Sequence, residues 1–140
     1  MLKQLSFLIL RLGTGGLMLL WGMMKVASPA SSIGVSEKYY GGALNSAMVQ
    51  MPLGAIQVAL GVAVILGLWR KVTYPAVAVV IGVGLLAIWK YIVDPMGLYV
   101  LTDGNHNPLF FPSLTVFGAT LAMMAFRADD TWSLDAKLFK

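Results

Sequence analysis

Apolar residues run along the chain in four long stretches, and polar or glycine-rich connections separate them. Each stretch has about 18 to 22 residues, which at a rise of about 1.5 Å per residue spans the hydrocarbon core of a bilayer. The pattern therefore predicts an all-α membrane protein, a bundle of four transmembrane helices in a single domain over residues 1–140. The predicted helices cover residues 5–26, 52–69, 74–93 and 109–126.

The two long connections, residues 27–51 and 94–108, are expected on the same side of the membrane because two crossings separate them. Within the first connection, residues 43–51 combine small and apolar side chains and predict a short interfacial helix. Pro52 is expected in the first turn of the second helix, where its missing N–H costs nothing. Asn107 is placed to cap the start of the fourth helix.

Composition supports a membrane environment. Apolar residues make up 59% of the chain and charged residues only 11%, whereas globular domains carry about 45–50% and about 25%. A chain so poor in charge cannot cover a water-exposed surface, but a lipid bilayer favours an apolar exterior. The net charge of +4 comes from basic residues scattered singly, so a lipid bilayer is the expected partner and nucleic acid is not.

The distribution of Lys and Arg predicts the orientation, because cytoplasmic loops carry the excess of basic residues. The side that holds the termini has six basic residues near helix ends: Lys3, Arg70, Lys71, Arg127, Lys137 and Lys140. The other side has three: Lys25, Lys38 and Lys90. We therefore expect both termini in the cytoplasm and a multi-pass protein of the bacterial inner membrane.

The first predicted helix carries two basic residues on one face. Steps of 100° per residue bring the following onto that face: Arg11, Thr14, Gly15, Met18, Gly22 and Lys25. We expect this face to turn into the bundle, with Gly15 and Gly22, and Gly54 and Gly61 of the second helix, permitting close helix packing. Arg11 and Lys25 either bind an anionic or quinone head group or extend to opposite interfaces.

Three further polar residues are candidates for binding. Gln57 either hydrogen-bonds a neighbouring helix or contacts a ligand. Lys90 lies four residues before Asp94, so the two are expected to form an ion pair on one helical face. His106 is either a solvated loop residue or a proton shuttle, or it ligates a metal together with Asp103.

Catalytic patterns are missing from the sequence. It has no cysteine and a single histidine, which excludes thiolate metal sites, disulfides and bis-histidine haem within one chain. It also lacks the motifs of serine hydrolases, zinc proteases and phosphate-binding loops. We predict no metal site. Whether the protein is an enzyme stays open, although the isolated chain has no self-contained catalytic or redox site.

Three segments resemble the DoxX family of small membrane proteins. Residues 11–25, RLGTGGLMLLWGMMK, are similar to its opening arginine, glycine-rich helix and closing G-x-x-K. Residues 53–70 resemble its second glycine-rich helix, which ends in G-L-x-x-R/K. Residues 107–118, followed by Trp132-Ser133-Leu134-Asp135, resemble its last helix and its W/Y-S-L-D tail. The segments occur in the family's order and cover nearly the whole chain.

The resemblance implies a four-helix membrane bundle with cytoplasmic termini. It also implies a role near thiosulfate:quinone oxidoreduction or near membrane oxidoreductases of oxidative-stress defence. Many relatives carry an acidic residue where this chain has Gln57, which removes support for a proton- or cation-linked role there.

The leading hypothesis is thus an accessory subunit of a quinone-linked oxidoreductase system, with a bound quinone or lipid as the only cofactor. Arg11 and Lys25 would line its pocket, and Tyr39, Tyr40 and His106 would form the outer mouth. The alternatives are a small transporter or metabolite-binding membrane protein, and a purely structural subunit of a larger complex. The expected protein partners are further copies of this chain or other membrane subunits.

Overall fold

The structure, a computed structural model, describes residues 1–101 and 106–138, and their regular elements are all helical. Along the chain these are α1 (Leu2–Ala27), α2 (Pro29–Tyr39), α3 (Ala47–Leu66), α4 (Arg70–Ala87), α5 (Trp89–Val93), the 3₁₀ turn η1 (Pro108–Phe110), α6 (Pro112–Ala125), the 3₁₀ turn η2 (Arg127–Asp129) and α7 (Leu134–Leu138). Four helical segments are long and apolar enough to cross a membrane: α1, α3, α4 and the stretch Pro108–Ala125. The prediction of an all-α protein with four such helices is therefore confirmed.

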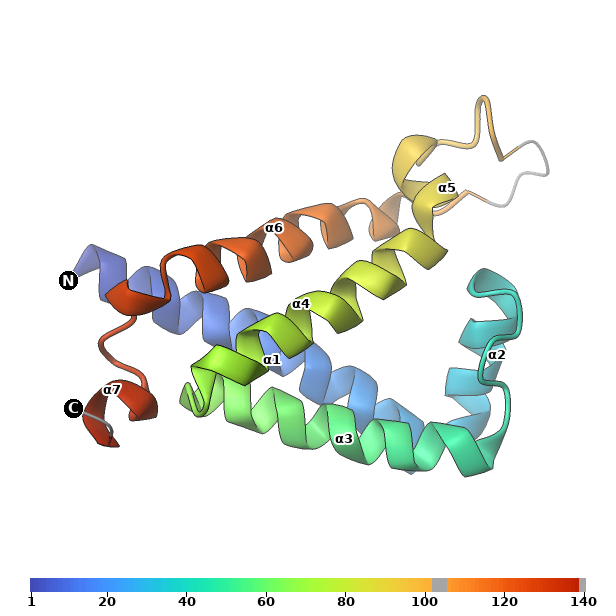
Figure 1. Cartoon of the computed structure of the whole chain (residues 1–140). Helices are drawn as coiled ribbons and strands as arrows, with labels where there is room; N and C mark the ends of the chain where they lie inside the picture. The colour runs from blue at the N-terminus through green and yellow to red at the C-terminus, as the bar shows by residue number, and fades with distance from the viewer. Residues whose placement is uncertain (102–105, 139–140) are drawn as a thin grey trace.

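The four long helices form two closely packed pairs. α1 runs beside α3 over most of its length, and α4 runs beside α6 (Figure 1). Both chain termini lie at one end of the molecule together with α7, whereas α2 and α5 lie at the opposite end (Figure 1). We call these the terminal end and the α2 end.

One face of α1 is buried in the bundle, and it is the face that the sequence predicts to turn inward. All six residues of the predicted stripe are buried, and Phe7 extends the stripe toward the terminal end. The hydrophobic core continues from this face onto the other long helices through Val64 of α3, Tyr74 of α4 and Met123 of α6.

Glycines set the distance between α1 and α3. A Cβ atom on Gly15 would lie 2.8 Å from the carbonyl oxygen of Gly61, and one on Gly22 would lie 2.7 Å from that of Gly54. Real Cβ atoms do not approach a carbonyl oxygen this closely, so the two backbones can touch only where side chains are missing. Small residues at such positions allow helices to gain close van der Waals packing in a bilayer, where no hydrophobic force drives them together.

The prediction of a short helix over residues 43–51 in the first connection is wrong. The connection instead holds α2, and residues 47–51 belong to α3, so Pro52 lies inside that helix rather than in its first turn. Buried Gln50 explains the early start. Its Oε1 accepts from Ser32 Oγ of α2 at 2.9 Å, and its Nε2 donates to the Leu44 carbonyl at 2.6 Å, which ties the first turn of α3 to α2.

Two other predicted boundaries also shift. The third helix breaks at Ile88, so the predicted span 74–93 divides into α4 and α5. Asn107 precedes η1 rather than α6, and its side chain accepts a hydrogen bond from the Leu109 N–H at 3.2 Å. Asn107 therefore caps the start of the fourth membrane-crossing segment, as predicted.

Neighbouring glycines on α1 provide a matched test of the close contact. Gly15→Ala should lower the free energy of unfolding in detergent by about 1–3 kcal/mol, because the added methyl overpacks the α1–α3 contact. Gly16→Ala should be neutral or stabilise by up to about 1 kcal/mol, because nothing lies within 4 Å of its Cβ position and alanine favours the helix. Equal effects of the two substitutions on thermal unfolding would contradict the contact.

Candidate functional site

The candidate binding residues on α1 belong to two separate places. Arg11 and Lys25 share the buried face of the helix, but at about 1.5 Å per residue they lie roughly 21 Å apart along it. Arg11 is near the terminal end and Lys25 is near the α2 end. A single pocket cannot use both side chains on one small head group.

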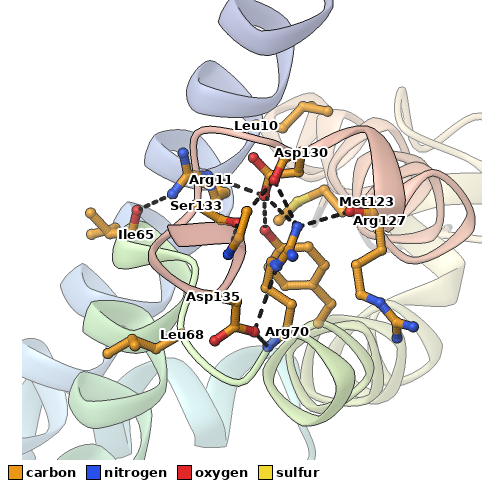
Figure 2. Close-up of polar contacts among 12 residues, drawn as sticks. Leu10, Arg11, Ile65, Leu68, Arg70, Met123, Arg127, Asp130, Ser133 and Asp135 are labelled. Carbon is orange, nitrogen blue, oxygen red and sulfur yellow. Dashed lines mark hydrogen bonds and ion pairs between the residues drawn. The ribbon is translucent and has the colours of Figure 1, made fainter. Parts of the chain in front are cut away.

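Arg11 is part of a largely buried group of charged and polar side chains that we call the arginine cluster: Arg11, Arg70, Tyr74, Asp130 and Asp135. Arg11 Nε lies 3.5 Å from Asp130 Oδ2, and the two side chains are only 3% and 0% exposed. Arg11 also donates from Nη1 to the Ile65 carbonyl of α3 at 3.0 Å. Figure 2 shows Arg11 from α1 and Arg70 from α4 converging on Asp130, which follows η2.

Arg70 and Tyr74 hold Asp130 from the α4 side. Tyr74 donates its phenolic O–H to Asp130 Oδ2 at 2.5 Å, and Arg70 Nη1 lies 3.7 Å from the same oxygen. Arg70 Nη1 also donates to the carbonyls of Arg127 and Asp130, both at 2.8 Å. Because both hydrogen bonds go to backbone carbonyls, Arg70 fixes the path of the chain after α6.

Asp135 closes the cluster by capping α4. Its carboxylate accepts from the backbone N–H of Trp69 at 2.8 Å and of Arg70 at 2.7 Å, and it lies 3.5 Å from Arg70 Nε. A carboxylate at a helix N-terminus is stabilised by the unpaired N–H groups and by the helix dipole. In total, two arginines face two aspartates, so the charges of the cluster balance.

Gly67 makes room for residues 133–135, which pack against the end of α3. It ends α3 in the left-handed conformation with φ of +68°, and a Cβ there would lie 2.5 Å from the Ser133 Cβ and 2.8 Å from Arg11 Nη1. The Gly67 carbonyl accepts from the Asp135 N–H at 3.1 Å. Two features therefore require glycine at position 67: the left-handed turn and the close approach of residues 133–135.

The acidic partner of Arg11, Asp130, is a neighbour that the sequence prediction missed. A usable signal was present, because the chain has only six acidic residues and three of them are Asp129, Asp130 and Asp135. A charged group inside a membrane-crossing helix requires a partner, and these aspartates belong to the same predicted side of the membrane as the start of α1. Arg11 is consequently engaged by the protein itself rather than free for a ligand.

Adjacent aspartates give a matched test of the cluster. Asp130→Asn should lower the free energy of unfolding by about 3–5 kcal/mol, because it leaves Arg11 buried without its counter-charge. Asp129→Asn should cost less than about 1 kcal/mol, because Asp129 pairs with Lys3 at an exposed position. Thermal unfolding of the two variants in the same detergent measures the difference. A similar loss in both would show that the buried pair is not the stabilising interaction.

The α2 end has a different character, with a cavity of about 300 Å³. Apolar and aromatic side chains from three elements line it: Leu20, Trp21, Met24, Val35 and Phe110. Leu20 is 67% exposed, so this wall of the cavity reaches the outer surface of the bundle. An apolar cavity of this size is at the lower end of the range for small-molecule sites.

Three aromatic rings pack together beside the cavity. The ring centroid of Tyr39 lies 4.8 Å from that of Phe110 and 5.6 Å from that of Tyr91, and Tyr91 and Phe110 are 5.3 Å apart, all edge to face. Phe110 belongs both to this group and to the cavity wall. The rings therefore join α2, α5 and η1 at one corner of the cavity, in the edge-to-face geometry that aromatic pairs prefer.

Lys25 adjoins the cavity through Trp21. Its ammonium lies 5.3 Å from the centroid of the Trp21 ring, close enough for a cation–π interaction. The side chain is 9% exposed and packs against Gly54. It makes no ion pair or hydrogen bond with a side chain or carbonyl in residues 1–101 or 106–138.

The other predicted site residues do not join one pocket. Gln57 is buried on α3 and is not among the residues that line the cavity, and its Oε1 has no hydrogen-bond partner in the part of the chain that the structure describes. Tyr40 is half-buried, and burial raises the pKa of its hydroxyl. His106 is exposed and packs near Gly97. Asp103, its suggested metal partner, lies outside the described residues.

The predicted ion pair between Lys90 and Asp94 is wrong. Lys90 is exposed, and its ammonium is not paired with Asp94, although the structure describes both residues. Asp94 ends α5 and instead accepts four backbone N–H groups, from Leu98, Tyr99, Val100 and Leu101, at 2.7–3.1 Å. These four donors satisfy the carboxylate without a cation.

The bonds to Asp94 predict how the following loop responds to pH. Burial alone would raise the pKa of Asp94, but the hydrogen bonds from Tyr99, Val100, Leu98 and Leu101 outweigh it and hold the pKa below its ordinary value. The carboxylate should thus protect the amides of residues 98–101 from hydrogen exchange at pH 4, with protection lost only as pH falls further. Asp94→Asn should remove much of that protection at pH 7, and unchanged protection factors would refute the assignment.

The fold and its four apolar spans define a multi-pass α-helical membrane protein. Comparison with protein-family models finds no match, and comparisons with curated proteins and with solved structures find none either. The resemblance to the DoxX family therefore stays a prediction that the residues of the chain carry by themselves.

Proposed function

We propose that this chain is a DoxX-like protein of the bacterial inner membrane, an accessory subunit of a quinone-linked oxidoreductase system. Both termini face the cytoplasm in this proposal. The excess of basic residues at the terminal end supports that orientation, as does the location of both termini at one end of the bundle (Figure 1). The α2 end and its cavity then face the outer side of the membrane.

The cavity at the α2 end is the observation that carries the proposal. Its apolar and aromatic lining suits a flat, lipophilic ring, and its opening beside Leu20 allows an isoprenoid tail to extend into lipid. Trp21 and Phe110 offer ring faces and edges for stacking. Because the volume is small, the cavity holds a quinone ring and leaves the tail outside.

Lys25 supplies the polar contact that a quinone requires. A lysine ammonium donates hydrogen bonds, and Lys25 already lies over the ring of Trp21 in the cavity wall. A quinone carbonyl that accepts from Lys25 would fix the ring relative to Trp21. The chain's part is to bind and orient the quinone, and the electrons come from a partner subunit.

Replacing Lys25 should weaken quinone binding. Lys25→Met keeps the length and packing of the side chain but removes the donor, and a hydrogen bond from a charged group is worth about 1.5–3 kcal/mol. We expect the affinity for a short-chain benzoquinone to fall by about tenfold or more, as measured by isothermal titration calorimetry in detergent. Phe110→Ala should also weaken binding, because it removes one wall of the cavity.

Lys137→Met provides the control, since Lys137 is an exposed lysine on α7 at the terminal end. Its affinity for the benzoquinone should equal that of the unmodified protein. Equal affinities of the Lys25 and Lys137 variants would refute the assigned contact. Protein extracted from native membranes without any co-purifying quinone would refute the proposed function itself.

A further inference from the structure

A second cavity, of about 540 Å³, opens at the terminal end between the α3–α4 turn and the chain after α6. Its lining contains three cations, Arg70, Lys71 and Arg127, and one carboxylate, that of Asp135. Trp69 and Val72 complete the lining. The cavity therefore carries an excess of positive charge, in contrast to the uncharged lining of the cavity at the α2 end. Neither the arginine cluster nor the proposed quinone site accounts for its excess of positive charge.

The charges in this cavity divide into a paired and an unpaired set. Arg70 and Asp135 belong to the balanced arginine cluster. The side chains of Lys71 and Arg127, by contrast, form no ion pair or hydrogen bond with residues of the two described ranges. Figure 2 shows the Arg127 side chain extending away from Arg11 and Asp130. Two positive charges therefore remain in the cavity without a counter-ion from the described chain.

A contact with Arg70 fixes the backbone position of Arg127. Its carbonyl accepts a hydrogen bond from Arg70 Nη1 at 2.8 Å, which holds the backbone of η2 against the start of α4. Lys71 follows Arg70 directly on α4. The same arginine that neutralises Asp130 thereby brings the two unpaired cations to one cavity.

The cavity lies where candidate membrane spans end, which is where lipid head groups are expected. It is bounded by the end of the span Ala47–Leu66, the start of the span Arg70–Ala87 and the residues after the span Pro108–Ala125. Trp69 and Val72 in its lining are 66% and 68% exposed. A tryptophan with an exposed apolar neighbour at a helix end is typical of the membrane–water interface, where acyl chains meet the head groups.

We infer that this cavity binds the head group of an anionic phospholipid, with the phosphate between Lys71 and Arg127 and the acyl chains over Val72 and Trp69. A phosphate diester carries one negative charge and acceptor oxygens for both cations. Basic pockets beside transmembrane helices on the cytoplasmic side are suited to such head groups. A zwitterionic lipid is disfavoured because it brings a cation of its own next to Lys71 and Arg127.

The experiment compares lipids and variants with the full chain in detergent. Phosphatidylglycerol, phosphatidylcholine and inorganic phosphate are each titrated, and binding is followed by native mass spectrometry and by the shift in unfolding temperature. Phosphatidylglycerol should bind and stabilise the protein, while the other two should not. At about 1 kcal/mol per basic residue near an anionic surface, Lys71→Gln with Arg127→Gln should weaken phosphatidylglycerol binding by roughly 25-fold.

A charge-matched control distinguishes binding of the lipid at this cavity from its general electrostatic attraction to a basic protein. Lys90→Gln with Lys137→Gln also removes two positive charges, both from exposed lysines outside the cavity, and it should leave phosphatidylglycerol binding within about twofold. Circular dichroism checks that all variants keep their helices. Equal losses in the two double variants, or equal binding of phosphatidylcholine, would overturn the proposal. Stabilisation by inorganic phosphate equal to that by the lipid would overturn the assignment to a lipid.

Discussion

The buried contact between Arg11 and Asp130 is the constraint that orders the terminal end of the molecule. A guanidinium within a membrane-crossing helix is costly unless an opposite charge meets it. The partner here comes from the far end of the chain, so residues 127–135 must fold back onto α1, α3 and α4. Arg70, Tyr74 and Gly67 can all be understood as the means of holding that returning segment in place.

Much of the fold could be predicted from the sequence because its main determinants are local. The length of each apolar stretch predicts a crossing helix, and the spacing of Arg11, Gly15, Gly22 and Lys25 predicts the buried face of α1. The start of α3 could not be predicted in this way, because it depends on the contact of Gln50 with Ser32 on another helix. The same reason explains the error at Asp94, whose carboxylate bonds to the loop after it rather than to the helix before it.

The candidate sites were harder to predict than the helices. The cavity at the α2 end joins Trp21, Val35 and Phe110, which are far apart in the sequence and carry no recognisable motif. Of the residues predicted for a pocket, Lys25 and Tyr39 adjoin this cavity or its aromatic group, whereas Arg11 is neutralised at the other end. A hydropathy pattern identifies polar residues in the membrane, but only the packing shows which of them still lack a partner.

The capping of α4 by Asp135 has a consequence for the order of events during synthesis. Arg11 and the turn at Gly67–Arg70 leave the ribosome well before Asp130 and Asp135, at elongation rates of about 5–20 residues per second. During roughly the first several seconds after α1 inserts, the guanidinium has no carboxylate to meet, and the N-terminus of α4 is uncapped. The arginine cluster therefore forms only after residues 130–135 have been synthesised, so the terminal end is ordered later than the entry of α1, α3 and α4 into the membrane.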